Sequence, residues 1–506
     1  MSLEGRTYGW IPSLAADLLL IAVIVFLGLR VLRRLAPEAR FTESLAAALP
    51  LGGGILTYIV FLASWAGIPV TVTSLVAAGA CVLAALLVWR RSPTRRHDDL
   101  PSQGLADSDR DRSPAARRLM WAVLAAVALT SALLSVGRSY SPWDSSAIWG
   151  AKGYGIALEG TIFAAREWGA HGLAYPLNVP LLISFFKLVS GDGIPGSKLL
   201  FPLFFVSTLL GVVTFWRRRG IGDWWIAAGV LFMGSIPDIF RHSTYGYVNI
   251  ALGAYLSLGT LWAVDGLGDA SRGRSVVGGI LLGLASWTRV EGLLYALAIA
   301  TALLVSSVVT RRNVRSSLWV FPPIVILAGL WLLFYRTYGV SGSQAGGAMA
   351  AAVDGWLRGD LRLGAVRLLL GVLRRRIFDL ETWGLAYPVA AVLVAIRGGR
   401  LFHRSVPVGS ALALATLAAG LATGIVFYVG SFTSTDFLGW LTRGLTQAML
   451  PVTILLMTLA ITLAGSEEDA AGLGSGSGAT RAGPAPDGAL NSTLSPMSAK
   501  GAAAPR

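Results

Sequence analysis

Long apolar runs, separated by short loops that carry arginine, recur along the chain from about residue 13 to residue 464. An apolar run of about 20 residues is long enough for a helix to cross a hydrocarbon core of ~30 Å. Thirteen spans fit the pattern, at about 13–31, 43–65, 69–89, 119–137, 196–215, 222–239, 246–265, 275–288, 291–309, 317–335, 382–397, 406–429 and 446–464. The pattern therefore predicts an all-α fold, a polytopic helical membrane protein with about 13 transmembrane helices.

Composition agrees with this class. Of the 506 residues, 54% are hydrophobic and only 14% are charged, and the mean hydropathy is +0.65. A soluble protein would carry roughly 25% charged residues. The single cysteine, Cys81, lies inside an apolar run and excludes a disulfide framework or a cysteine-based metal site. The net charge of +15 comes largely from arginines in loops between spans, a pattern of membrane topology rather than of nucleic-acid binding.

The arginines also predict the orientation, because cytoplasmic loops are enriched in Lys and Arg. The runs Arg33-Arg34 and Arg217-Arg218-Arg219 each end a span, so we place these span ends in the cytoplasm, with the N-terminus outside and the C-terminus inside. Arg272 and Arg274, in a later loop, are predicted to lie on the same cytoplasmic side. The first span is followed by arginines and by no small-residue cleavage site, so we expect it to be retained rather than cleaved as a signal.

Three regions follow from this organisation. Residues 1–118 form an N-terminal three-span segment that ends in a polar cytoplasmic loop, 90–118, which is expected to be flexible. Residues 119–465 form a membrane core. The Gly-, Ser-, Ala- and Pro-rich stretch 466–506 is expected to be a disordered cytoplasmic tail.

Some helical segments are expected outside the spans, on the outer face. Residues 148–163 and 176–189 are moderately apolar and interrupted by charges, as in amphipathic helices that lie in the interface plane. Residues 336–380 combine an apolar set, mostly leucines, with surrounding arginines and predict a basic amphipathic helix. The arginines around the apolar set are Arg358, Arg362, Arg367, Arg374, Arg375 and Arg376. Binding to anionic lipid and a part in substrate binding are equally good interpretations of this helix.

One acidic residue between tryptophans stands out. Asp144 lies in the stretch from Tyr140 to Trp149, directly after the fourth span, and Trp143 and Trp149 are the expected anchors in the headgroup layer. An anchoring role does not explain an acid at this place. Asp144 is therefore the candidate catalytic carboxylate; the alternative is a helix N-cap.

Other polar residues are predicted to reach the same outer face. Ionisable groups beside or within spans are costly, which makes them functional candidates. The set consists of Asp238, Arg241, His242, Tyr245, Tyr247, Asn249, Arg289, Glu291, Asp436, Trp440 and Arg443. Two of them, Asp238 and His242, are four residues apart and have no obvious third ligand, so they indicate a metal site only weakly.

The order of these motifs resembles that of bacterial membrane glycosyltransferases of the C-type superfamily (GT-C), which are similar to protein O-mannosyltransferases and the lipid A aminoarabinose transferase. The resemblance extends over about 119–465. The residues that carry it are Ser141–Asp144, Ala147–Trp149, Lys152, Tyr175–Leu177, Tyr247–Asn249, Gly283–Gly292, Arg443, Gln447 and Pro451.

The resemblance implies an inverting glycosyltransferase that moves a hexosyl or pentosyl group from a polyprenyl-phosphate carrier to a glycan, glycolipid or protein of the cell envelope. Asp144 is then the general base, with the active site on the outer face of the cell membrane. Arg443 is the first candidate for binding the donor phosphate, followed by Lys152 and Arg289. Supporting or substrate-binding residues are Trp143, Tyr175, Tyr247, Asn249 and Glu291.

The sequence departs from the family pattern at two places. Asn249 stands where the family often has an aspartate, and His171 lies in a loosened version of a His-Pro-Asp-Tyr-Pro motif. No cofactor is therefore expected, and a divalent metal is left as an open alternative.

Simpler interpretations stay open. The alternative to substrate contact for Arg289 and Glu291 is an ion pair that braces the turn. The alternative to phosphate binding for Arg443 is an arginine whose side chain extends to the membrane interface. For the whole chain, the alternatives to an enzyme are a flippase or transporter for lipid-linked sugars and a non-catalytic membrane relative of the family.

Overall fold

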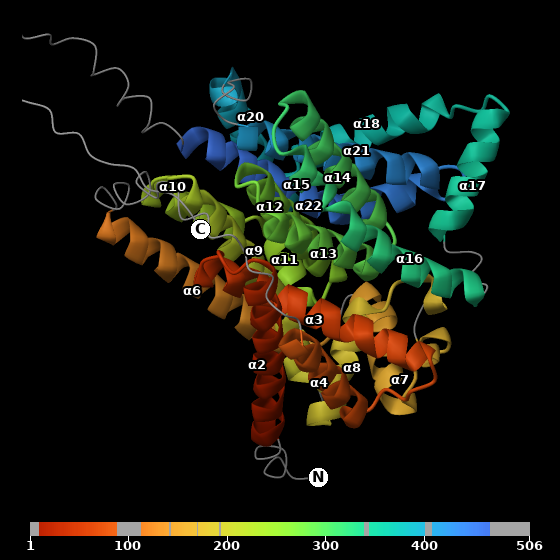
Figure 1. Cartoon of the computed structure of the whole chain (residues 1–506). Helices are drawn as coiled ribbons and strands as arrows, with labels where there is room; N and C mark the ends of the chain where they lie inside the picture. The colour runs from red at the N-terminus through yellow and green to blue at the C-terminus, as the bar shows by residue number, and fades with distance from the viewer. Residues whose placement is uncertain are drawn as a thin grey trace, which may run out of the picture. The chain divides into compact units, whose positions relative to one another are not determined.

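The computed structural model describes residues 10–88, 113–140, 143–168, 171–191, 194–338, 344–399 and 407–465. Within these ranges all regular structure is helical. The helices of the first half (Figure 1) are α2 (Trp10–Leu35), α3 (Phe41–Trp65), α4 (Val72–Val88), α6 (Pro114–Val136), α7 (Ala151–Glu159), α8 (Asn178–Ser190), α9 (Ile194–Arg218), α10 (Asp223–Gly234) and α11 (Pro237–Tyr245). Those of the second half are α12 (Val248–Gly268), α13 (Arg272–Thr288), α14 (Gly292–Val309), α15 (Val314–Leu318), α16 (Phe321–Thr337), α17 (Gln344–Leu357), α18 (Leu363–Ile377), α19 (Leu380–Trp383), α20 (Ala386–Arg397), α21 (Pro407–Gly430) and α22 (Phe437–Gly465).

Nine helical segments in the described ranges are long and apolar enough to cross a membrane. They are 12–35, 41–65, 114–136, 195–218, 248–268, 292–309, 314–337, 408–430 and 437–465. The other four predicted spans correspond to the shorter helices α4, α10, α13 and α20. The prediction of an all-α, multi-pass membrane protein is confirmed, and nine of the 13 predicted spans have the length and hydropathy of a membrane-crossing helix in the described residues.

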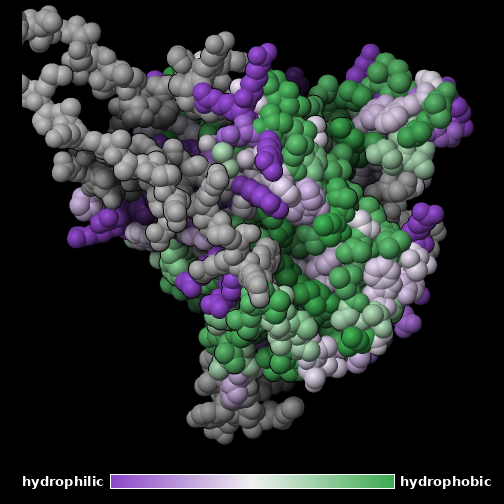
Figure 2. Space-filling model, viewed as in Figure 1, coloured by the Kyte–Doolittle hydropathy of each residue, from purple (hydrophilic) through white to green (hydrophobic). Residues whose placement is uncertain are grey.

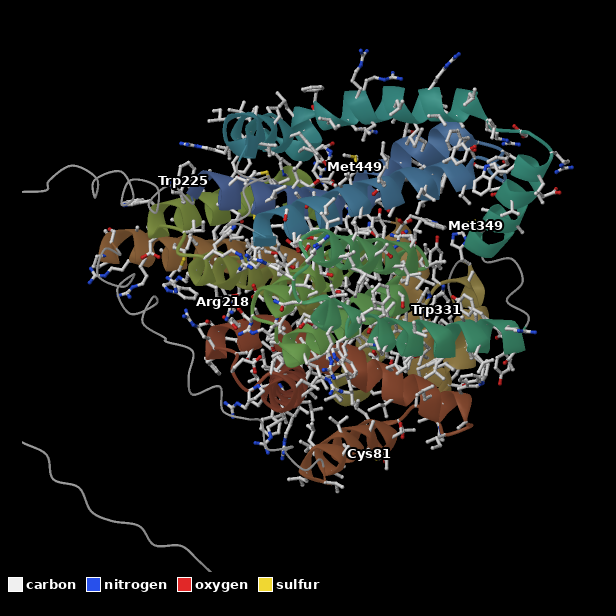
Figure 3. The ribbon with its side chains drawn as sticks, turned by 45° about the horizontal axis from the view of Figure 1, so that its top comes forward. Cys81, Arg218, Trp225, Trp331, Met349 and Met449 are labelled. Atoms are coloured by element: carbon white, nitrogen blue, oxygen red, sulfur yellow. The ribbon has the colours of Figure 1, made fainter. Side chains whose placement is uncertain are left out.

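Apolar side chains on the outside of the helices agree with a lipid environment. Three examples, all well exposed, are Leu19 on α2, Val88 on α4 and Leu129 on α6. Figure 2 shows broad apolar areas on the visible face, with hydrophilic residues gathered in separate clusters. The free Cys81 is likewise exposed on α4, at the edge of the bundle in Figure 3. A soluble monomer rarely exposes contiguous apolar surface of this extent.

Helix α12 lies at the centre of the bundle. Every residue from Val248 to Gly266 is buried, as expected for a helix that is apolar on all faces. It packs against α9, α13 and α22. At the contact with α13, a Cβ atom added to Gly278 would lie 2.7 Å from the backbone nitrogen of Ala263. Small residues thus allow the two backbones to approach closely, as they do in membrane helix pairs.

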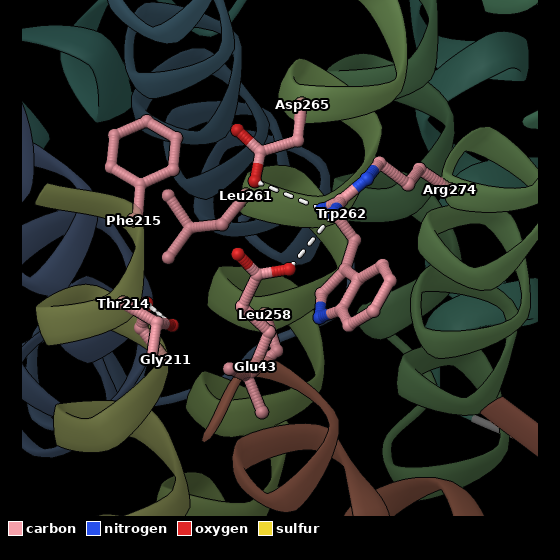
Figure 4. A pocket seen from close by; sticks show the side chains of 9 residues that line it. All are labelled: Glu43, Gly211, Thr214, Phe215, Leu258, Leu261, Trp262, Asp265 and Arg274. Atoms are coloured by element: carbon pink, nitrogen blue, oxygen red, sulfur yellow. Dashed lines mark hydrogen bonds and ion pairs between the residues drawn. The ribbon is translucent and has the colours of Figure 1, made fainter. Parts of the chain in front are cut away.

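A network of buried charges joins one end of four central helices. Arg274, at the start of α13, donates to Glu43 of α3 at 2.8 Å and lies 3.6 Å from Asp265 at the end of α12. Figure 4 shows Glu43, Asp265 and Arg274 around a gap of ≈10 Å³, about the size of one water molecule.

Helix α9 completes the network at its C-terminal end. Arg218, labelled in Figure 3, lies 3.1 Å from Glu43 and 3.4 Å from Asp265. Arg219 is 2.7 Å from Asp265. The arginines predicted to share one side of the membrane are therefore found together, and they are compensated by acidic groups.

The segments outside the predicted spans agree with expectation in part. Helix α18 is amphipathic: Leu369 and Val372 are buried, whereas Arg367, Arg374 and Arg375 are exposed. Helix α8 differs from an interfacial helix, because all residues from Asn178 to Phe186 are buried, between α2, α3, α7 and α9. Most of the predicted loop 90–118 and the predicted tail from 466 lie outside the described residues.

Arg274→Ala should lower the free energy of unfolding by about 3 kcal/mol, because it leaves buried carboxylates with fewer partners. Equilibrium unfolding of the purified protein in detergent micelles measures the effect. Arg312→Ala, which removes an exposed arginine between α14 and α15, is the control and should change the unfolding free energy by less than about 0.5 kcal/mol. Equal effects of the two substitutions would contradict a stabilising role for the network.

Candidate active site

Asp144 begins a seven-residue π-helix, η2 (Asp144–Gly150), which leads directly into α7. The π-helix is a rare conformation that occurs most often at functional sites. Trp143 occupies the N-cap position and is 59% exposed. An exposed tryptophan at this place agrees with the predicted interfacial anchor.

The carboxylate of Asp144 is half-buried and makes no hydrogen bond or ion pair with the described residues. The N-cap of η2 is Trp143, and no side-chain cap hydrogen bond is present. The structure thus does not support the alternative in which Asp144 caps a helix. Its oxygens are available for a substrate.

Tyr175 is the centre around which the predicted site residues gather. Its ring centroid lies 5.3 Å from Trp149 and 5.4 Å from His171, both in edge-to-face geometry. Two cations also approach the ring, with Lys152 Nζ at 5.4 Å and Arg289 Cζ at 6.0 Å from the centroid. Residues from η2, α7, the segment before α8 and the α13–α14 turn are therefore brought together.

Lys152 is fully buried in α7, and its Nζ atom has no hydrogen-bond partner. Burial lowers the pKa of the amine from 10.5 to about 8. Burying an ammonium group without a counterion lowers the free energy of unfolding, so Lys152 destabilises the folded protein. Such groups are candidates for binding an anionic ligand.

The turn between α13 and α14 holds a charged pair. Arg289 Nε lies 2.6 Å from Glu291 Oε1, and Arg289 Nη1 donates to Asn249 Oδ1 at the start of α12. Gly292 is required here, because an added Cβ would lie 2.1 Å from the carbonyl oxygen of Ala285. The ion pair that the sequence left as one alternative is present, and the donor group of the Asn249 amide, Nδ2, remains without a partner.

The charge of Asp144 affects the pKa values of several of these groups. Burial raises the pKa of Tyr175, and Glu291 and Asp144 raise it further, against the opposing effect of Arg289. Burial also raises the pKa of Tyr247, with Asp144 as the next contributor. Burial alone would lower the pKa of Arg289, but Glu291, Tyr175 and Asp144 raise it. Asp144, Tyr175, Tyr247 and Arg289 therefore share one electrostatic environment.

Arg443 lies in a different part of the site from Lys152 and Arg289. With Thr446 and Gln447 of α22, and with Tyr247, it lines a cavity of ≈310 Å³. Its side chain is 74% exposed and lies 3.2 Å from Asp436. The three predicted phosphate-binding residues are thus divided between two positions.

Asp238 and His242 line the same cavity. Within the described ranges, however, no group of three or more His, Cys, Asp or Glu residues could hold a metal ion. A metal at this pair would depend on ligands from a substrate or from water.

Two supporting elements were not predicted from the sequence. A buried relay joins Thr57 of α3, Asn178 of α8 and Thr288 of α13 through hydrogen bonds of 2.8 Å, and it holds the residue next to Arg289. No sequence signal distinguishes these residues from ordinary polar residues in spans.

The second is Lys198 of α9, which is fully buried. Its Nζ atom donates to the carbonyl oxygens of Ser139 at 3.4 Å and Thr244 at 3.2 Å. It also lies 4.8 Å from the ring of Tyr140, so it links the loop before Asp144 to the end of α11. A lysine inside an apolar run was a usable signal.

Comparisons with known proteins add little to this geometry. No protein-family model matches the sequence, and no curated protein matches it significantly. Among solved structures, the chain is similar to the archaeal oligosaccharyltransferase AglB from Archaeoglobus fulgidus, solved in complex with an inhibitory peptide and a dolichol-phosphate. The identity is 14% and the TM-score 0.39, over 67% of this chain and 50% of AglB. The chain thus matches half the length of AglB.

Lys152→Met should raise the free energy of unfolding at pH 7 by about 3 kcal/mol. The reason is that the pKa of Lys152 falls from 10.5 in the unfolded chain to about 8 in the folded protein, and this difference measures the cost of burying the charge. Below pH 8 the amine is protonated in both states and the folded protein bears the full cost. Between pH 8 and 10.5 the unfolded chain binds more protons, so wild-type stability rises with pH, and the Met variant lacks this rise.

Unfolding in detergent between pH 7 and 10.5 measures both effects. Lys187→Met is the matched control, because Lys187 is only half-buried, and it should retain the rise. A Lys152→Met protein that is less stable than wild type at pH 7 would show that the amine is compensated.

Proposed function

We propose that this chain is an integral membrane glycosyltransferase that moves a sugar from a polyprenyl-phosphate carrier to a cell-envelope acceptor at the outer face, with Asp144 as the general base. The observation that carries the proposal is the meeting of an unpaired carboxylate, Asp144, with Lys152 and Arg289 around Tyr175. A free carboxylate suits proton abstraction, and fixed cations suit a departing phosphate.

The reaction assigns one role to each group. The acceptor hydroxyl attacks the anomeric carbon, and its proton passes to the carboxylate of Asp144. The bond between the anomeric carbon and the phosphate oxygen breaks, and the carrier phosphate leaves with the electron pair. Attack opposite the leaving group inverts the anomeric configuration. Arg443 is the first candidate for the positive charge that stabilises the phosphate, followed by Lys152 and Arg289.

The position of these groups favours transfer over transport. Asn249 is the second residue of α12, and Arg289 is the C-cap of α13, so both lie at helix ends. Transporters usually place their substrate groups near mid-membrane, at interrupted helices. A site at the helix ends suits chemistry at the membrane surface, where the headgroup of a lipid-linked sugar lies.

Asp144→Asn should lower sugar transfer at least about 100-fold, because the amide cannot accept the proton of the acceptor. Membranes with and without the protein are supplied with radiolabelled polyprenyl-phosphate sugars, and label in the glycan, glycolipid and protein fractions is counted. Asp354→Asn, which changes an exposed carboxylate of α17 paired with Arg358, is the control and should retain transfer.

Full activity of Asp144→Asn would exclude the general-base role. Movement of intact lipid-linked sugar between leaflets, without label in any acceptor, would identify the protein as a flippase instead.

A further inference from the structure

The ≈310 Å³ cavity beside Tyr247 has two chemically different walls. One wall is buried and contains His242 of α11, and the other is open to solvent and contains Arg241 of α11 and Arg443 of α22. The lining residues are Asp238, Arg241, His242, Tyr245, Tyr247, Arg443, Thr446 and Gln447. Pockets that bind small molecules begin at about 300 Å³. The cavity is therefore large enough for one sugar ring with its phosphate and too small for an oligosaccharide.

The buried wall contains a histidine whose tautomer is fixed. His242 is 3% exposed, and its Nδ1 atom lies 2.7 Å from the carbonyl oxygen of Asp238. A carbonyl only accepts hydrogen bonds, so Nδ1 carries the proton, and in the neutral ring Nε2 is left as an acceptor. The carboxylate of Asp238 lies 3.4 Å from the same Nδ1 atom. Nε2 itself has no hydrogen-bond partner.

The open wall contains two arginines from different helices. Arg241 of α11 is 46% exposed in its side chain, and Arg443 of α22 is 74% exposed. Arg241 lies 3.6 Å from Asp238, and Arg443 donates a hydrogen bond to Asp436 at 3.2 Å in an exposed pair. Guanidinium groups bind phosphate through two parallel hydrogen bonds, so this wall suits a phosphate oxyanion.

Tyr247 connects the cavity to the candidate base. Its ring lies 4.7 Å from that of His242, and it is within the electrostatic influence of both Asp144 and Asp238. A ligand beside Tyr247 would therefore lie in the electrostatic environment that Asp144 influences. Tyr245, the other aromatic residue of the wall, has its ring 6.5 Å from that of Tyr247.

We propose that this cavity binds the glycosyl-phosphate head group of the donor, with Arg241 and Arg443 on the phosphate and His242 Nε2 accepting a hydrogen bond from a sugar hydroxyl. The assignment rests on the proposed function and extends it, because it makes Arg241 a phosphate-binding residue and His242 the residue that selects the sugar. A site that hydrogen-bonds a substrate hydroxyl discriminates strongly against analogues that lack it.

Binding of soluble probes tests the assignment without requiring transfer. The purified full chain in lipid nanodiscs is titrated with glucose 1-phosphate, inorganic phosphate and glucose, and the heat of binding is recorded. Arg241→Ala and Arg443→Ala should each weaken both phosphate-containing probes about tenfold. His242→Phe should weaken glucose 1-phosphate about tenfold and leave inorganic phosphate unchanged. Arg336→Ala, which removes an exposed arginine at the end of α16, should change neither.

Two controls guard against misfolding. His242→Gln keeps a hydrogen-bond acceptor in a side chain of similar reach and should restore part of the loss seen with Phe. In the wild-type chain, ¹⁵N-labelled histidine gives a readout that needs no variant. The chain has four histidines, and His242→Gln identifies the signal of His242. Glucose 1-phosphate should shift the Nε2 resonance of His242, whereas inorganic phosphate should not.

The outcomes separate this proposal from the proposed function. Equal losses for both phosphate probes in His242→Phe would mean that His242 does not recognise the sugar, and an Nε2 resonance that no probe shifts would mean that Nε2 contacts no ligand. Either result would overturn the assignment. Normal sugar transfer combined with either result would leave the glycosyltransferase function intact. Binding as expected in a protein without any transfer activity would support the cavity and refute the function.

Discussion

A charge buried among apolar helices is stable only when an opposite charge compensates it, and this constraint differs between the two ends of the central helices. At one end, Glu43 and Asp265 are paired with Arg218, Arg219 and Arg274, so α3, α9, α12 and α13 are joined at one fixed register. Because these helices are anchored there, their other ends are held in defined positions. The opposite ends of α12 and α13 carry Asn249 and Arg289, and α9 begins near the loop that leads to Asp144.

The functional end shows the reverse pattern. Lys152 Nζ, Asn249 Nδ2 and His242 Nε2 are buried atoms without a hydrogen-bond partner. Each unsatisfied group lowers the stability of the folded protein, and groups of this kind are retained where a ligand completes them. Buried nitrogens without a hydrogen-bond partner also occur at the other end, on Arg219 and Arg274, but there an acidic side chain lies within 4 Å of each arginine. At the functional end, a substrate can complete the unpartnered groups.

The site also has an internal division. Around Tyr175, Lys152 and Arg289 form a cationic region next to Asp144. Beyond Tyr247, the cavity with Arg443 forms a second one. A glycosyl transfer brings an anionic carrier and an acceptor to one carboxylate, so two polar regions within the electrostatic influence of Asp144 suit a reaction with two substrates.

The sequence by itself determined the class of the protein and the ends of its main helices. Periodic apolar runs located α3, α12 and α14, because a span must satisfy its backbone within one helix, and loop arginines grouped Arg217–Arg219 with Arg274. Only the tertiary structure decided how polar residues meet. The burial of α8, the relay through Thr57 and Asn178, and the separation of Arg443 from Lys152 depend on how the helices pack against one another. Hydropathy reports whether a segment enters the membrane, but it does not specify which neighbour each face of the helix contacts.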